Sequence, residues 1–317
     1  MGAMHKVDGF STFPFQVSAR RAAAGVMCSG VVALSACAAG GPGAAAPSAA
    51  APAPAVPAEG GGAAGGPAAA QGAPRGFDLA SARVVDLTHP ITPEMPLFPG
   101  GKPYAAQTLG TVEKDGYYIN RFSMDEHAGT HVDAPAHFKA GAAAVEQIAP
   151  EHLVGPAAVV DVTAKVAASP DHQVTVEDLR GWEARHGALG PRHIVLVRTG
   201  WAARWGDPAR YLNQDAKGVM HFPGVSVEAS RYLHERGVRG VGIDTLSTDP
   251  GPSQTFEQHK AFLGAGGYHI ENLANLDQLP ETGAVVMVAP LPLVRGSGAP
   301  ARVLALVPAA GEAAGGK

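Results

Sequence analysis

The sequence predicts an α/β fold, and two observations carry that prediction. From Ala80 onward, short runs rich in β-branched apolar residues are separated by turn residues, a pattern typical of buried strands. Between these runs lie two amphipathic segments that have the start and stop signals of helices. Buried strands that alternate with helices pack as the layers of an α/β domain. No fixed-period repeat is visible between residues 77 and 310, so we expect a single domain there.

Six apolar runs are the predicted strands. They are Val84–Leu87, Ala157–Val162, Ile194–Arg198, Val238–Ile243, Ala284–Val288 and Val303–Val307. The first predicted helix covers Val176–His186, with two acidic residues in its first turn and Gly187 after its end. The second covers Val227–Arg236, with Ser226 as its cap and Gly237 as its end.

The N-terminal part of the chain has the organisation of an export signal. Arg20 and Arg21 precede an apolar run from Ala22 to Leu34, which is followed by small residues. This run is too short to remain in a bilayer as a spanning helix. Leu34-Ser-Ala-Cys37 resembles the bacterial lipobox, whose cysteine becomes the lipidated first residue of the mature protein. We therefore expect an exported protein that only its N-terminal lipid tethers to the membrane.

The predicted boundaries follow from this signal and from a low-complexity stretch. Residues 38–76 are almost wholly Ala, Gly and Pro, so they offer no apolar face of useful size and are interpreted as a linker. We expect an export signal over residues 1–36, the lipidated cysteine and linker over 37–76, and a catalytic domain over 77–317. A disulfide between Cys28 and Cys37 fits less well, because both lie in an apolar segment. Cleavage leaves one cysteine, which excludes structural disulfides and thiolate metal sites.

The charge balance excludes one class of partner. The formal net charge is −4 and the isoelectric point is about 6.3. We find no cluster of Lys and Arg with interleaved aromatic residues that could neutralise phosphates. We therefore expect no binding to nucleic acid.

The densest group of ionisable residues lies between Asp125 and Phe138. Three histidines and three carboxylates fall within fourteen residues there, and imidazole nitrogen with carboxylate oxygen suits zinc, manganese or a similar divalent ion. His131 and Asp133 are two apart, so on an extended segment they face the same side, and Gly129 lets the backbone bend so that His127 can converge on them. Pro135 suits a rigid turn after the ligands.

Two other interpretations of this segment are weaker. In a helix, His127 and His131 would have the i, i+4 spacing of helical zinc proteases, but Gly129, Thr130 and Pro135 disfavour a helix. A polar loop with surface histidines would not explain four regularly spaced candidate ligands bracketed by Gly and Pro. A metal site is therefore the favoured hypothesis.

His127-Ala-Gly-Thr-His131-Val-Asp133-Ala-Pro-Ala-His137 resembles the HxGTHxDxPxH signature of the cyclase-type metal hydrolases, which include isatin hydrolase and bacterial kynurenine formamidase. A second match lies downstream, where His259 and Glu271 are twelve residues apart. The resemblance runs from about Val84 to Val307. It implies a mixed α/β sheet in the swivelling β/β/α arrangement, and homo-oligomers of two or more copies.

Carried over residue by residue, the resemblance implies five metal ligands and one proton carrier. The ligands are His127, His131, Asp133, His259 and Glu271. The first three would hold one ion, and Asp133 and Glu271 would bridge to a second ion bound by His259. His137 would be the acid/base. Family members contain Zn²⁺ or Mn²⁺, as one or two ions. We assign His259 as a ligand and leave His269 out.

The expected reaction is the hydrolysis of an amide. A divalent ion lowers the pKa of bound water from about 15.7 towards 7 and polarises carbonyl oxygens. His137 would move the proton to the departing nitrogen. Non-catalytic solute binding by a lipoprotein is the alternative from another class, but such proteins usually have two comparable lobes and no need of an acid/base histidine.

The substrate prediction rests on departures from one branch of the family. Kynurenine formamidases typically carry a Trp where this sequence has Phe98, which weakens N-formylkynurenine as a substrate. The segments from Asp249 to Ser253 and from Gly296 to Pro300 are similar to isatin-hydrolase-like members. We therefore expect ring opening of a small cyclic amide, an isatin-like lactam, with arylformamidase activity as the alternative. Phe98, Phe222 and Trp201 are the candidates for an aromatic pocket.

Overall fold

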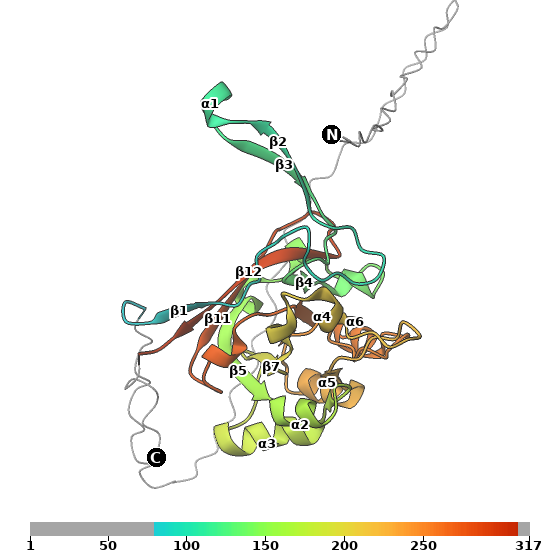
Figure 1. Ribbon diagram of the computed structural model, residues 1–317. Coiled ribbons are helices and arrows are strands. Elements are labelled where there is room, and N and C mark those ends of the chain that lie inside the picture. Colours follow the sequence, from blue (N-terminus) through green and yellow to red (C-terminus); the bar gives the residue numbers. More distant parts are fainter. Residues whose placement is uncertain (1–78, 310–317) are drawn as a thin grey trace, which may run out of the picture. The chain divides into compact units, whose positions relative to one another are not determined.

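The computed structural model describes residues 79–309 (Figure 1), all within one compact unit. An eight-stranded mixed sheet forms its centre, in the order β1-β12-β11-β5-β7-β9-β10-β4. The bounds of these strands are β1 (Arg83–Asp86), β4 (His131–Asp133), β5 (Val154–Asp161), β7 (Ile194–Arg198), β9 (Gly240–Ile243), β10 (Tyr268–Glu271), β11 (Val285–Pro290) and β12 (Gly298–Val307). The strands from β5 to β10 run parallel, and the other pairings are antiparallel.

The long strand β12 closes the sheet on itself. Its first residues, Gly298 to Pro300, pair with β4, whereas Ala301 to Leu306 pair with β11. Because β4 also pairs with β10, the pairings from β12 through β11, β5, β7, β9, β10 and β4 return to β12. The strand that carries part of the metal signature is therefore held on both sides.

Alternating side chains divide the interior into two cores. Ala157 and Val159 of β5 belong to a cluster shared with β1, β10, β11 and β12. Ala158 and Val160 point the other way, into a cluster with the apolar faces of the helices. This period of two is what a strand buried on both faces requires.

Helices cover the second core, on one side of the parallel strands (Figure 1). They are α2 (Thr163–Ala168), α3 (Val176–His186), α4 (Pro208–Leu212), α5 (Val227–Glu235) and α6 (Glu257–Gly264). Thr175 caps α3 through a capping box with Asp178, and Ser226 accepts a hydrogen bond from the amide of Ala229 to cap α5. Short 3-10 turns complete this part: η1 (Pro135–His137), η2 (Val145–Gln147), η3 (Pro150–His152), η4 (Trp201–Arg204) and η5 (Leu276–Gln278).

Two small sheets stand apart from the central one. One pairs β6 (Gln173–Val174) with β8 (Gly224–Val225). The other is a hairpin of β2 (Ala105–Gly110) and β3 (Ile119–Ser123), with the short helix α1 (Val112–Asp115) at its tip. We call residues 105–123 the arm. Its strands pair only with each other and project from the sheet (Figure 1).

The predicted α/β class with a mixed sheet is confirmed. The predicted bounds of β7 and α3 agree with the structure, and the other five predicted strands each overlap an observed one. β12 begins at Gly298 rather than Val303, because its first part pairs with β4. The arm, α6 and β10 were not predicted. The predicted export signal, Cys37 and linker lie outside the described residues. Within residues 79–309, no helix is long and apolar enough to cross a membrane.

Candidate metal centre and pocket

Strand register brings two distant segments of the chain to one site. β4 and β10 pair antiparallel, so that Glu271 lies directly across from His131, and His269 across from Asp133. His131 and Asp133 project to the same face of β4, as their spacing predicted, because side chains alternate along a strand. The 3-10 turn η1 begins at Pro135 and carries His137 back to the same side.

Two hydrogen bonds to Asn272 fix the turn that precedes β4. Gly129 has φ +67°, the left-handed conformation that bends the chain there. The hydroxyl of Thr130 donates to the Asn272 carbonyl at 2.6 Å, and the Asn272 amide group donates to the Gly129 carbonyl at 2.8 Å. The signature segment is thereby tied to the residue that follows Glu271.

The buried Asp133 carboxylate is the centre of the site. Its Oδ1 atom lies 2.6 Å from His127 Nδ1 and 3.1 Å from His131 Nε2. Its Oδ2 atom lies 3.3 Å from His259 Nε2, which is also 3.3 Å from Glu271 Oε1. The carboxylates of Asp133 and Glu271 therefore face one ring nitrogen from each of three histidines.

These short contacts shift the pKa values in opposite directions. Burial alone would raise the pKa of Asp133, but the neighbouring imidazoles, chiefly His131, hold it well below its usual range. Burial alone would lower the pKa of His131, but Asp133 and Glu271 raise it to about 9. The same carboxylates, with Asp249, hold the pKa of His259 well above its usual range. The site therefore favours positive charge between these groups.

Each of the three histidines has a partner for its other ring nitrogen. His131 Nδ1–H donates to the Gly129 carbonyl at 2.9 Å, and His259 Nδ1–H donates to the buried Asp249 carboxylate at 2.6 Å. Both rings consequently present Nε2 to Asp133. Such outer partners fix the tautomer and orientation of metal-binding histidines.

His127 is oriented by a chain of two hydrogen bonds. The Ser297 hydroxyl donates to Glu126 Oε2 at 2.7 Å, so its oxygen accepts from His127 Nε2–H at 2.8 Å. This polarity leaves Nδ1 of His127 to face Asp133. Close packing supports the arrangement, because a β-carbon at Gly298 would lie only 2.5 Å from the His127 ring.

The donor set fits a divalent cation. Donor atoms of Asp133, His259, His269 and Glu271 lie within 4.8 Å of one another, and so do those of His127, Asp133 and His137. A cation would replace the protons that now mediate the histidine–carboxylate contacts. Nitrogen and oxygen donors without thiolate suit Zn²⁺ or Mn²⁺. The two groups share Asp133, so its carboxylate lies within reach of both sets of donor atoms.

His137 differs from the three histidines that have outer partners. Its ring stacks on His127 with centroids 3.9 Å apart, and burial lowers its pKa to about 4. Among residues 79–309, no hydrogen bond reaches its ring nitrogens. It is therefore neutral near pH 7 and free to exchange a proton.

His269, which the sequence analysis left out, is fully buried beside the site. Thr248 Oγ1 donates to Gln258 Oε1, so it accepts from His269 Nδ1–H at 3.2 Å, and the Gln258 amide group donates to His269 Nε2 at 3.3 Å. Both ring nitrogens are thus already engaged. Burial also lowers its pKa, which fits a neutral ring that supports the site.

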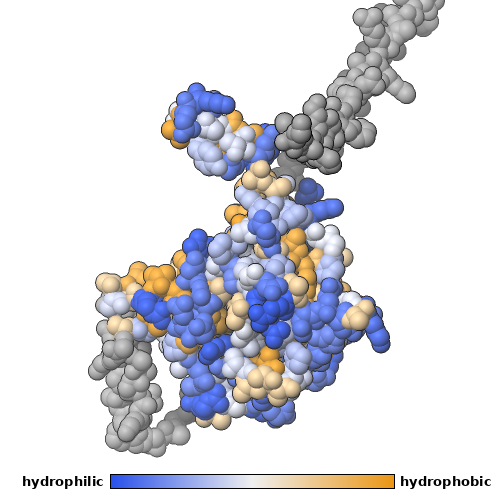
Figure 2. Space-filling view, viewed as in Figure 1, coloured by the Kyte–Doolittle hydropathy of each residue, from blue (hydrophilic) through white to orange (hydrophobic). Residues whose placement is uncertain are grey.

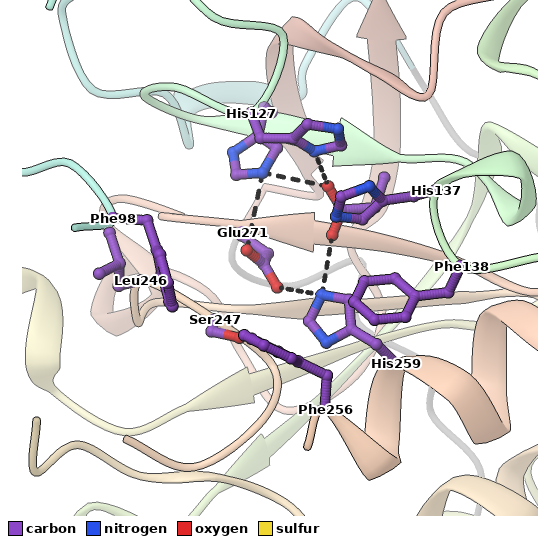
Figure 3. Close-up of a pocket in the computed structure, with 11 residues that line it drawn as sticks. Phe98, His127, His137, Phe138, Leu246, Ser247, Phe256, His259 and Glu271 are labelled. Carbon is purple, nitrogen blue, oxygen red and sulfur yellow. Dashed lines mark hydrogen bonds and ion pairs between the residues drawn. The ribbon is translucent and has the colours of Figure 1, made fainter. Parts of the chain in front are cut away.

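The candidate metal ligands line the floor of a cavity of about 320 Å³. Its walls are mainly apolar: Phe98, Phe138, Leu246 and Phe256, with Ser247 as the one hydroxyl. Figure 3 shows these side chains around the histidines. Phe98 lines the pocket as predicted. Phe222 and Trp201 do not, because the structure buries both in the core beneath the helices.

Sequence reasoning missed several residues of the site. Asp249 and Ser297 lie within segments that the resemblance had singled out, but their roles depend on contacts with His259 and with His127, 170 residues away from Ser297. Glu126 lies within the predicted cluster, but the sequence did not indicate that Ser297 is its hydrogen-bond partner. Phe138 and Phe256 had no signal beyond their aromatic side chains.

Comparison with known proteins places the chain among related hydrolases. Residues 85–250 match the family model described as putative cyclase. Isatin hydrolase of Roseibium aggregatum is 34% identical over 244 residues, which cover 72% of this chain and 92% of that protein. Kynurenine formamidase of Bordetella pertussis is 30% identical over 223 residues, 70% of this chain and 97% of that protein.

Solved structures agree with the sequence comparisons. Isatin hydrolase A from Ralstonia solanacearum superposes with a TM-score of 0.67 and 41% sequence identity, over 72% of this chain and 93% of that one.

The Ser297 contact yields a test of metal binding. Ser297→Ala removes the acceptor for His127 Nε2–H, so the ring is no longer held in one tautomer and orientation. We expect the affinity for Zn²⁺ to fall about 10- to 100-fold in competition with a chelator. Ser169→Ala, an exposed serine far from the site in sequence, is the control and should bind like the wild type. Unchanged Zn²⁺ affinity in Ser297→Ala would show that the hydrogen bond to Ser297 is not needed to orient His127 for metal binding.

Proposed function

Because the chain belongs to the cyclase family of metal-dependent hydrolases, we propose that it opens the ring of a small cyclic aryl amide, an isatin-like lactam. One observation carries the proposal furthest. A histidine with free ring nitrogens stands beside three histidines that are oriented for metal, on the floor of a pocket with aromatic walls. A non-catalytic solute-binding protein would have no use for that free histidine.

In this proposal, five side chains hold one or two divalent ions. His127, His131 and Asp133 would bind the first, and Asp133 and Glu271 would bridge to a second at His259. When bound, Zn²⁺ or Mn²⁺ acidifies a water molecule and polarises the carbonyl oxygen of the substrate. The outer partners at Gly129, Asp249 and Ser297 keep the three imidazoles in place while charge develops.

His137 supplies the proton transfer. Because its pKa is about 4, it is unprotonated near pH 7 and can accept the proton of the attacking water. It then returns the proton to the departing amide nitrogen. Its stacking on His127 keeps this ring next to the metal ligands without a competing hydrogen bond.

The walls of the pocket favour a flat, largely apolar substrate. Phe98, Phe138 and Phe256 form one side, and aromatic rings bind such molecules through their faces and edges. The extensive similarity to isatin hydrolase supports a lactam. N-formylkynurenine is the second candidate, supported by the similarity to kynurenine formamidases.

The test combines a substrate screen with one substitution. We expect purified residues 77–317 to contain a divalent metal by mass spectrometry and to open isatin-like lactams faster than they hydrolyse N-formylkynurenine. His137→Ala should keep its metal and lose about 100-fold or more in kcat, because general acid/base catalysis contributes about 10²- to 10⁴-fold. Activity on neither substrate would overturn the proposed function. Full turnover by a metal-loaded His137→Ala protein would overturn the role of His137.

We also propose that the protein is exported and lipid-anchored through Cys37, as the N-terminal sequence pattern indicates. One acyl chain alone binds membranes weakly, so stable anchoring requires the multiply acylated cysteine of a mature lipoprotein. Cys37→Ser should therefore shift the expressed protein from the membrane fraction to the soluble fraction of the cell envelope. Equal membrane content in the two proteins would contradict this proposal.

A homo-oligomer is the third part of the proposal, and the arm supports it. Six large apolar side chains of the arm are exposed: Leu109, Val112, Tyr117, Tyr118, Ile119 and Phe122. Two arms together supply on the order of 1,000 Å² of buried area, the lower limit for a specific interface. In Figure 2 this projection shows some orange among blue and white residues. The tip of the arm bears Glu113 and Asp115 against one lysine, which disfavours an anionic membrane surface. We therefore assign the arm to a second copy of the chain.

The arm can be tested by sedimentation. Tyr117→Asp with Phe122→Asp should convert a dimer into a monomer whose unfolding midpoint for the central domain is unchanged, because neither side chain is part of the two cores. Val294→Asp, at an exposed position outside the arm, is the control and should remain dimeric. A monomeric wild type, or a dimer that survives the double substitution, would contradict the assignment. Vesicle binding that only the arm variant loses would indicate a lipid surface instead.

A further inference from the structure

Phe256 has an unusual backbone conformation for its residue type. Its φ and ψ are 53° and 47°, in the left-handed region. Among residues 79–309, only four other non-glycine residues have positive φ. Three of them are asparagines, which tolerate the left-handed conformation. A bulky aromatic residue in this region is a strained outlier, and the structure around it must hold it there.

The position also disfavours phenylalanine for a second reason. Phe256 is the N-cap of α6, where Ser, Thr, Asp and Asn are preferred because their side chains accept the first amide hydrogens. Phe256 provides no such bond. The carboxylate of Asp249 accepts from the amides of Gln258 and His259 instead, at 3.0 and 3.1 Å. The helix is thus capped from a distance, and position 256 is released from the capping role.

Neighbouring contacts keep the strained conformation in place. The Phe256 amide donates to Ser253 Oγ at 3.2 Å, and its carbonyl accepts from the Lys260 amide at 3.0 Å. The Ser253 amide donates in turn to the Pro250 carbonyl at 2.8 Å. The loop before α6 therefore fixes the direction in which the Phe256 side chain leaves the backbone.

That direction places the ring in the wall of the pocket (Figure 3). Its centroid lies 5.9 Å from that of Phe98 and 5.7 Å from that of Phe138, and both pairs are tilted. It lies 6.0 Å from the His259 ring, edge to face. Because His259 is only three residues further along the chain, the ring and the metal-facing imidazole are set by the same turn.

Locally unfavourable residues that a fold retains are concentrated at functional positions. Ordinary packing would not require strain, since Phe256 is only half-buried. We infer that Phe256 is a specificity-determining residue, held in a strained conformation so that its ring selects flat aromatic groups over aliphatic rings of equal size. The inference rests on the proposed function for its substrate class, but its structural part stands independently.

Three substitutions separate the ring from the strain. Phe256→Asn removes the ring and tolerates the left-handed conformation. Phe256→Leu removes the ring but keeps the strain. Phe256→Tyr keeps both. We expect the thermal midpoint of the Asn variant to exceed that of the Leu variant, although leucine is the more apolar residue. An Asn variant that unfolds at a lower temperature than the Leu variant would contradict the inference that the backbone at position 256 is strained.

The selectivity is measured by calorimetry on the metal-loaded protein with benzoate and cyclohexanecarboxylate as probes. Wild type and Phe256→Tyr should prefer benzoate by about tenfold, as aromatic pairs allow. In the Asn and Leu variants the ratio should fall towards one. An unchanged ratio, or no preference in the wild type, would overturn the inference. These probes need no turnover, so an inactive wild type with intact benzoate preference would reject the proposed reaction while supporting Phe256.

Discussion

The antiparallel pairing of β4 with β10 is the constraint on which the whole centre depends. It sets Glu271 opposite His131 and His269 opposite Asp133, so a shift by one residue would move the Glu271 side chain to the opposite face of the sheet from His131 and Asp133. The bonds between Thr130, Asn272 and Gly129 hold this register at one end. The other features of the site depend on this register. They are the shared carboxylate of Asp133, the outer hydrogen-bond partners of the histidines and the cavity above them.

Local patterns were sufficient for those parts of the protein whose causes are local. The bounds of α3 and β7 followed from capping residues and from an apolar run, and the common face of His131 and Asp133 on β4 followed from their spacing. Family resemblance was needed for His259 and Glu271, because nothing in their own neighbourhood distinguishes them from a helix-surface histidine and a strand-end glutamate. The sheet's closure through β12 could not be predicted, since its pairing with β4 joins residues about 165 positions apart.

The failures have equally physical causes. Phe222 was a reasonable pocket residue by type, but aromatic side chains serve a core as readily as a pocket, and its segment faces the core beneath the helices. Phe256 gave no usable signal because its conformation contradicts local preference. The arm escaped detection because its apolar residues are not buried by its own chain. In each case no neighbouring residue in the sequence decides the outcome.

The closure of the sheet by β12 also has a consequence for the order of assembly. β4 is synthesised early, but one of its two neighbouring strands, Gly298–Val307, lies close to the C-terminal end of the described residues. Ser297, which orients His127, emerges just before it. A growing chain can therefore form the helices and parallel strands while its metal ligands are still unsupported. His127 can therefore take up its final orientation only after Ser297 and the last strand of the sheet are in place.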